Sequence, residues 1–209
     1  MGPVMKRPME IIPIGPLFPR KGSRFSKTIA RLVLKMTGWR VTGSVPNVPK
    51  AVLIGGPHTS NWDFPFGVLS LFVLGLDVHW IGKHTIFRWP FGVILRRFGG
   101  IPVNRTSPGA LFRDVIRGFE ENDSFVFGLS PEGTRSKVTK WKPGFHRIAR
   151  TAKVPILPAS LDFVKREIHF GPLFDPSDNF QEDVTRLQKY YSQFSAKRPE
   201  LNGMLSPDA

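Results

Sequence analysis

The chain has 209 residues, of which 41% are hydrophobic and none is cysteine. This length and composition predict one folded domain with a substantial core and exclude a disordered tail protein. The lack of cysteine excludes disulfides, thiolate nucleophiles and cysteine-based zinc sites, as suits a reducing compartment. With 30 Lys and Arg against 16 Asp and Glu, the net charge of +14 indicates an anionic partner: nucleic acid, an anionic membrane surface or a phosphorylated substrate.

The basic excess is concentrated at the N-terminal end. The first 50 residues contain ten Lys or Arg and a single acidic residue, Glu10. Four Pro or Gly residues between positions 13 and 19 interrupt any apolar run there, so we expect no export signal. We divide the chain into a basic N-terminal segment, 1–40, and a single α/β domain, 41–209.

Within this segment, RFSKTIARLVLKM at 24–36 predicts an amphipathic helix. On a helical wheel one face holds Phe25, Ile29, Leu32, Val33 and Met36, and the opposite side holds Arg24, Lys27, Arg31 and Lys35. Leu34 lies off the apolar face. The pattern favours a helix that docks on an anionic membrane surface, although a helix packed on the core with its basic side in solvent is the alternative.

The next apolar stretch, FPFGVLSLFVLGL at 64–76, has no charged residue. A helix needs about 20 residues to cross a bilayer, so this stretch predicts a buried or interfacial helix. No other apolar stretch is long enough to span. If the protein meets a membrane, we expect it to do so from one side.

The remaining elements alternate between strand and helix. In chain order we expect strands at 50–56 and 78–82, a helix at 90–98, a strand or loop at 101–105, a helix at 108–121, a strand running into a loop at 124–133, a helix at 144–153, strands at 154–164 and 166–173, and a closing helix at 178–197. This alternation predicts an α/β layered fold, a mixed sheet flanked by helices.

The stretch GGPHTSNWDF contains the first candidate site residues, His58 and Asp63. Residues five apart on a helix are separated by about 140°, so a turn has to bring these two together. Pro57 and Pro65 favour a loop between a strand and a helix. There Asp63 can accept a hydrogen bond from His58 Nδ1 and leave Nε2 as a base. The alternative is that Asp63 caps the helix and His58 is a turn residue.

A second candidate is the loop in LSPEGTRS. Gly133 permits close approach of the backbone, Thr134 offers a hydroxyl, and the Arg135 guanidinium suits bidentate phosphate binding. The alternative is a Pro-Gly turn with an exposed pair of Glu132 and Arg135. Arg105 follows the apolar run of GGIPVNR in the same way.

Four stretches, HTSNWD, GGIPVNR, PEGTRS and VPILPAS, resemble in order and spacing the motifs of the PlsC-like lysophospholipid acyltransferases. The best known members of this family are the 1-acylglycerol-3-phosphate acyltransferases. The resemblance covers residues 52–160 approximately and implies a glycerophospholipid acyltransferase-like fold.

The resemblance implies acyl transfer from a thioester, acyl-CoA or acyl carrier protein, to the hydroxyl of a lysophospholipid. His58 is then the general base and Asp63 its orienting partner. The implied acceptor-binding residues are Arg105, Glu132, Gly133, Thr134 and Arg135. A thioester is already activated, so we expect neither a cofactor nor a metal.

Two positions depart from the family pattern. Pro57 precedes the motif histidine, where relatives commonly have Asn, and Asn104 precedes Arg105, where they commonly have Asp. These departures leave the acceptor open: another amphiphile with a free hydroxyl or amine is the alternative. Lys83, after a predicted strand, is a possible phosphate or coenzyme contact or an exposed lysine.

The other features of the sequence give weaker indications of function. FRWPFG is either core or an interfacial anchor, and His79, His84, His146 and His169 fit packing or surface positions. A nucleic-acid binder is disfavoured because no RNP, zinc or helix-turn-helix signature occurs. A serine hydrolase is disfavoured because G-x-S-x-G is absent and Ser130 has the wrong spacing. We expect a peripheral or monotopic protein on the cytoplasmic side of a membrane.

Overall fold

A computed structural model describes residues 12–89, 91–103, 108–134 and 140–202. The strands of its sheet are β1 (Arg40–Gly43), β2 (Lys50–Gly56), β3 (His79–Lys83), β4 (Gly100–Val103), β5 (Phe125–Leu129), β6 (Ile156–Asp162) and β7 (Glu167–Phe170). The α-helices are α1 (Arg24–Thr37), α2 (Asp63–Leu74), α3 (Phe91–Arg97), α4 (Pro108–Glu121), α5 (Gly144–Ala152) and α6 (Phe180–Tyr191). Two short 3₁₀ helices are η1 (His84–Phe87) and η2 (Pro199–Leu201).

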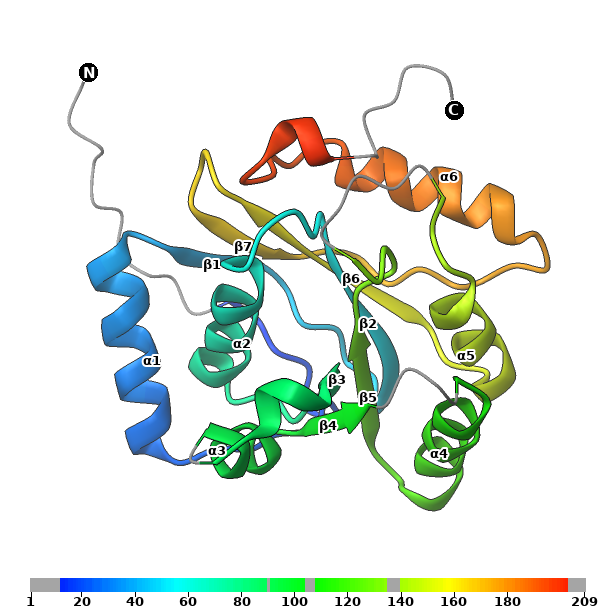
Figure 1. Cartoon of the computed structure of the whole chain (residues 1–209), viewed down its shortest axis with the longest axis horizontal. Coiled ribbons are helices and arrows are strands. Elements are labelled where there is room, and N and C mark those ends of the chain that lie inside the picture. The colour runs from blue at the N-terminus through cyan, green and yellow to red at the C-terminus, as the bar shows by residue number, and fades with distance from the viewer. Residues whose placement is uncertain (1–11, 90, 104–107, 135–139, 203–209) are drawn as a thin grey trace.

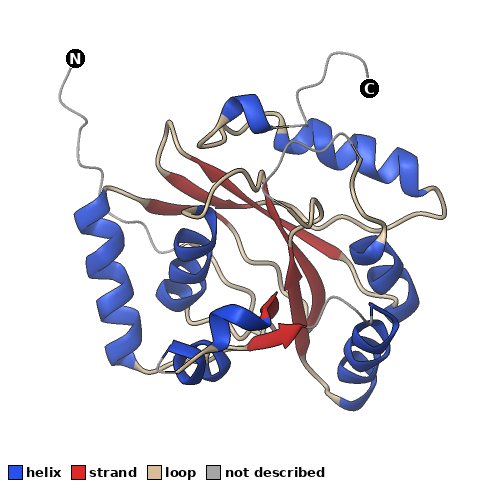
Figure 2. Ribbon diagram, in the orientation of Figure 1, coloured by secondary structure: helices blue, strands red, loops and turns tan. Residues whose placement is uncertain are grey.

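The strands form one mixed sheet in the order β1-β7-β6-β2-β5-β3-β4 (Figure 2). From β6 to β4 the neighbours are parallel, whereas β7 is antiparallel to β6. β1 pairs in parallel with β7, so these two strands run against the rest. The mixed sheet flanked by helices that the sequence predicted is confirmed.

Helices cover both faces of the sheet (Figure 1). α1 and α2 lie on one face, and α4, α5 and α6 lie on the other. Adjacent strand residues point to opposite faces, so Leu53 joins the core under α2 while Val52 joins the core under α5. The Tyr191 hydroxyl donates to the Ile54 carbonyl at 2.7 Å and anchors the end of α6 beneath β2.

The chain changes faces between two neighbouring strands. β2 leads into α2 on one face, and β5, its neighbour, leads into α5 on the other. In open α/β sheets ligands bind in the crevice at such a switch point, beyond the carboxyl ends of the strands. We therefore expect a ligand-binding site at the loops that follow β2 and β5.

Most predicted elements are present, with differences at their ends. α4 has the predicted bounds, but the closing helix ends at Tyr191 rather than 197. At its other end Asn179 caps α6 by accepting from Glu182 N at 3.2 Å. Strand β1 was not predicted, because its four residues, RVTG, are too few and too polar to show a strand pattern.

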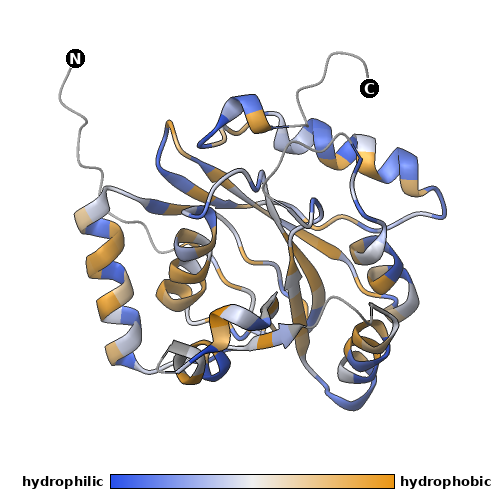
Figure 3. Ribbon diagram, viewed as in Figure 1, coloured by the Kyte–Doolittle hydropathy of each residue, from blue (hydrophilic) through white to orange (hydrophobic). Residues whose placement is uncertain are grey.

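Helix α1 packs on α2 with a different face from the one that the wheel suggested. Ala30 and Leu34 are buried in the shared core, although Leu34 had been the residue off the apolar face. The apolar face itself is largely in solvent, with exposed fractions of 75% for Phe25, 45% for Ile29, 56% for Leu32 and 78% for Met36. Orange and blue segments accordingly alternate along α1 in Figure 3. In the described parts of the chain, no helix is both long and apolar enough to cross a membrane.

Candidate active site

His58 lies in the loop that joins β2 to α2, and Asp63 is the first residue of that helix. His58 Nδ1 lies 3.3 Å from Asp63 Oδ2. The loop therefore brings the two predicted side chains together, with the histidine Nδ1 toward the carboxylate. The Asp63 side chain is 2% exposed, so its carboxylate is buried. The His58 side chain is 25% exposed, so its imidazole ring remains accessible to solvent or substrate.

The loop itself holds the Asp63 carboxylate in place. Asp63 Oδ2 accepts hydrogen bonds from the backbone N–H groups of Thr59 at 2.7 Å and Ser60 at 2.6 Å. Asp63 Oδ1 accepts from the Ser60 hydroxyl at 2.8 Å. These donors precede the helix, so Asp63 closes the loop that carries His58. A closed loop of this kind restricts where the imidazole can go.

Glu132, in the loop after β5, also contacts the His58 loop. Its Oε1 accepts a hydrogen bond from the His58 backbone N–H at 2.9 Å, and the residue is 4% exposed. Burial raises the pKa of Glu132 to about 7, with a smaller raising effect from the Asp63 charge, against the lowering effect of the His58 bond. The carboxyl is thus placed to position the histidine loop, and its contact with an acceptor stays a prediction.

Three of the other predicted binding residues, Gly133, Thr134 and Lys83, lie at the same edge of the sheet. Gly133 has φ +66°, a left-handed conformation that favours glycine, and Thr134 follows it. Lys83 ends β3. Arg105 and Arg135 lie outside the described residues, and so does Asn104. The proposed phosphate contacts of these side chains therefore stay predictions.

The C-terminal segment braces the same loop, which the sequence analysis did not foresee. The Arg198 backbone N–H donates to Thr59 Oγ1 at 3.2 Å, one residue from His58. Lys197 Nζ lies 5.1 Å from the centre of the Trp62 ring, one residue from Asp63. Arg198 and Thr59 are 139 positions apart in sequence, so no local sequence pattern could predict their contact.

A cavity of about 180 Å³ adjoins His58 between α2 and the sheet. Its polar lining includes His58, Asp63 and Ser130, whereas most of the other lining residues are apolar. Two glycines make room for it: a Cβ atom added at Gly55 or at Gly67 would meet no atom within 4 Å. The cavity was not predicted from the sequence, although Gly67 within the charge-free stretch 64–76 was the available signal.

Ser130 contributes an unusual group to this lining. Its Oγ is buried and has no hydrogen-bond partner among the described residues. A buried hydroxyl without a partner costs free energy, which makes Ser130 a candidate donor to a ligand in the cavity.

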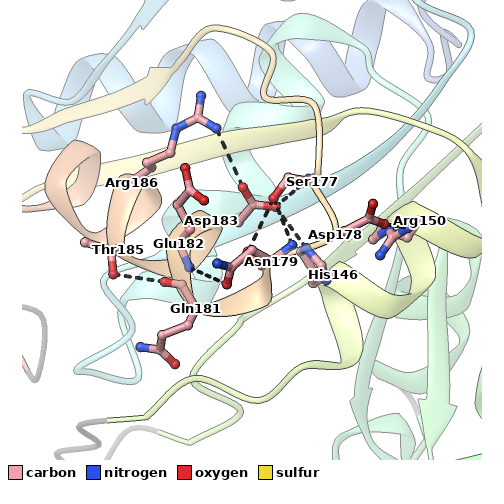
Figure 4. A network of polar contacts seen from close by, with 10 residues as sticks. All are labelled: His146, Arg150, Ser177, Asp178, Asn179, Gln181, Glu182, Asp183, Thr185 and Arg186. Atoms are coloured by element: carbon pink, nitrogen blue, oxygen red, sulfur yellow. Dashed lines mark hydrogen bonds and ion pairs between the residues drawn. The ribbon is translucent and has the colours of Figure 1, made fainter.

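A second His–Asp pair lies away from this cavity (Figure 4). His146 Nε2 of α5 lies 2.9 Å from Asp183 Oδ2 of α6, and both side chains are buried. The same carboxylate accepts from the Ser177 backbone N–H at 2.6 Å, and Arg186 reaches its other oxygen at 3.6 Å. This network joins two helices on the far face of the sheet, which is a structural role.

The remaining histidines do not face the cavity either. His79 stacks on Phe125, with ring centres 4.9 Å apart, and burial lowers its pKa. Burial also lowers the pKa of His169, whose Nδ1 lies 3.0 Å from Thr42 Oγ1. His84 is exposed on η1. Among the residues that the structure describes, no cluster of three or more His, Asp or Glu could hold a metal ion.

Comparisons with known proteins point to one family. The acyltransferase family model matches residues 39–162, which include both loops of the site. Among solved structures, the 1-acyl-sn-glycerophosphate (LPA) acyltransferase PlsC from Thermotoga maritima is similar, with a TM-score of 0.59 at 16% identity, over 81% of this chain and 76% of that chain. At this identity the likeness concerns the fold. No curated protein sequence matches the chain.

Proposed function

The chain belongs to the acyltransferase family, and we propose that it moves a fatty acyl group from an acyl thioester to the hydroxyl of a lysophospholipid such as 1-acylglycerol-3-phosphate. The observation that carries this proposal is the pair of His58 and Asp63 at the polar end of an apolar cavity. The pair supplies a base for the hydroxyl, and the cavity supplies an apolar site for the chain.

In the proposed reaction His58 Nε2 takes the proton of the acceptor hydroxyl. The oxygen then attacks the thioester carbonyl, the C–S bond of the tetrahedral intermediate breaks, and the imidazolium returns the proton to the leaving thiolate. Asp63 faces Nδ1 at 3.3 Å, so it holds the ring orientation and stabilises its charged form. A base positioned in this way contributes about 10² to 10⁴ in rate.

The developing oxyanion needs a hydrogen-bond donor as well. Ser130 lines the same cavity, and its Oγ is buried and makes no hydrogen bond within the described structure. We assign it the role of donating to the thioester oxygen as that oxygen becomes negative. Such donors are worth more in a water-excluded site than in solution.

The acceptor is proposed to bind at the loop after β5. Lys142 packs over Gly133: a Cβ atom added at that glycine would lie 3.3 Å from Lys142 Nζ. This cation stands beside the loop where the motif places Thr134 and Arg135, so a phosphate there would meet positive charge. The acceptor for which the Thermotoga protein is named, 1-acyl-sn-glycerophosphate, fits the same chemistry.

The proposed partner is an anionic membrane surface, approached from the cytoplasmic side. Residues exposed on α1 combine four apolar side chains with Arg24, Arg31 and Lys35. Trp89 and Val93, near α3, are also 86% and 65% exposed. Each cation near such a surface contributes about 1 kcal/mol, and buried apolar side chains add a term that salt does not weaken.

The test is a two-substrate assay with the purified chain. Acyl-CoA or acyl carrier protein thioesters are mixed with lysophosphatidic acid, and thiol release and the acylated product are measured together. We expect release that depends on the acceptor and phosphatidic acid as the product. Release without an acceptor would indicate a hydrolase, and product only with another amphiphile would reassign the acceptor.

A further inference from the structure

We propose that Leu71 and Val78 form the end wall of the cavity beside His58 and thereby limit the length of the acyl chain that the enzyme buries. The inference rests on the proposed function, since it takes the acyl group to occupy this cavity. It adds the residues that determine chain-length specificity.

The position of the wall follows from two neighbouring cavities. Leu71 and Val78 line the cavity beside His58, and both also line a second cavity of about 10 Å³. The two residues therefore separate one cavity from the other. Val78 is 2% exposed, and Leu71 is partly buried against the same core.

The chemistry changes beyond this wall. The lining of the second cavity includes Lys21 and Asp77, whose side chains form an ion pair at 3.3 Å, besides apolar residues such as Phe72 and Leu76. Methylene groups that passed the wall would meet this ion pair as well as apolar side chains. A chain that fits before the wall is thus favoured over one that has to cross it.

The depth of the cavity indicates the chain length. Asp63 and Leu71 are eight residues apart on α2, which corresponds to about 12 Å along the helix axis. The volume of the cavity beside His58, about 180 Å³, is slightly larger than the volume of about 150 Å³ of engineered cavities that bind benzene. We therefore expect roughly six to eight carbons of the acyl chain to be buried.

Gly67 lines the side of the same cavity. It lies on α2 between Asp63 and Leu71, and a Cβ atom there would meet no atom within 4 Å. A larger side chain at this position would fill the space without displacing packed atoms. Gly144 is a matched control, because it is also helical and open at Cβ but exposed on α5 and outside the cavity.

The experiment measures kcat/KM for acyl-CoA thioesters of 4 to 16 carbons, at about two-carbon steps, with one acceptor. For wild type we expect a maximum near about eight carbons, since each buried methylene contributes about fourfold. Gly67→Leu is expected to lower kcat/KM for octanoyl-CoA at least tenfold relative to butanoyl-CoA. Leu71→Ala is expected to move the maximum toward longer chains, and Gly144→Leu is expected to leave the profile unchanged.

A second measurement separates this inference from the proposed function. Titration calorimetry of unreactive S-alkyl-CoA thioethers reports chain binding whether or not the protein turns over a thioester. The wall is supported if, in wild type, Gly67→Leu and Leu71→Ala, the affinity for the thioethers depends on chain length in the same way as is expected for kcat/KM. Identical chain-length profiles in all three proteins, each with a cooperative melting transition, would overturn it, whereas absent turnover with length-dependent binding would count against the proposed function alone.

Discussion

The backbone N–H of His58 donates to the side chain of Glu132, with 2.9 Å between His58 N and Glu132 Oε1. This bond joins the loop after β2 to the loop after β5, and so joins the candidate base to the loop that we propose binds the acceptor. Because the carboxyl is buried, its ionisation is linked to folding as well as to the position of the histidine.

Glu132→Gln should therefore change how stability depends on pH. The pKa of this carboxyl rises from 4.5 to about 7 on folding, so ionisation destabilises the folded state. The penalty is absent below about pH 4.5, grows as pH rises toward 7 and is complete above it, at most about 3 kcal/mol. Glutamine keeps an acceptor for His58 N–H and removes the charge. Urea unfolding should show the variant gaining stability over wild type between pH 5 and pH 8, and Glu120→Gln, exposed on α4, should show no such gain.

Ser130→Ala tests the proposed oxyanion donor. Removal of a hydroxyl that has no partner in the described structure should leave the folded state as stable as wild type or more so. The turnover number should fall by at least about tenfold, since loss of one such donor costs about 10² to 10³ in well-studied cases. Unchanged kcat in a variant with an unchanged melting temperature would remove Ser130 from the mechanism.

Gly67→Ala should stabilise the protein. Glycine inside a helix costs about 0.5 to 1 kcal/mol relative to alanine, and here a Cβ atom meets no neighbour within 4 Å. We expect the free energy of unfolding to rise by about that amount in denaturant titrations. A decrease would mean that the space beside α2 is smaller than the structure indicates.

The docking role of α1 can be separated into charge and apolar terms. Arg24→Gln, Arg31→Gln and Lys35→Gln together should weaken co-sedimentation with anionic vesicles mainly at low salt. Phe25→Ser with Met36→Ser should weaken it at every salt concentration and leave the melting temperature unchanged, because these side chains are 75% and 78% exposed. Leu34→Ala is the matched comparison: it should cost about 2 to 5 kcal/mol of stability. A large loss of stability in the double variant would return α1 to a core-packing role.

The sequence could predict what depends on neighbouring residues. The amphipathic helix, the loop between Pro57 and Pro65 and the pairing of His58 with Asp63 all follow from short stretches of chain. Four motifs in order then indicated the family. The bounds of α4 were predicted because Pro108 starts that helix with a residue suited to its first turn.

What the sequence could not predict depends on contacts between distant segments. Leu34 rather than Phe25 faces the core, because the position of α2 decides which side of α1 is covered. The cavity is likewise empty space bounded by five different strands and a helix, so no single stretch shows it. Neither the brace of Arg198 on Thr59 nor the bond of Glu132 to His58 has a local pattern.

The most direct test of the mechanism is the single-turnover rate of His58→Ala with saturating thioester and acceptor. His58 is partly exposed and its side chain makes one polar contact among those described, so the variant should fold with a melting temperature close to wild type. We expect a rate at least about a hundredfold lower, with unchanged binding of an S-alkyl-CoA thioether. A folded His58→Ala protein that acylates the acceptor at a rate near wild type would contradict the mechanism.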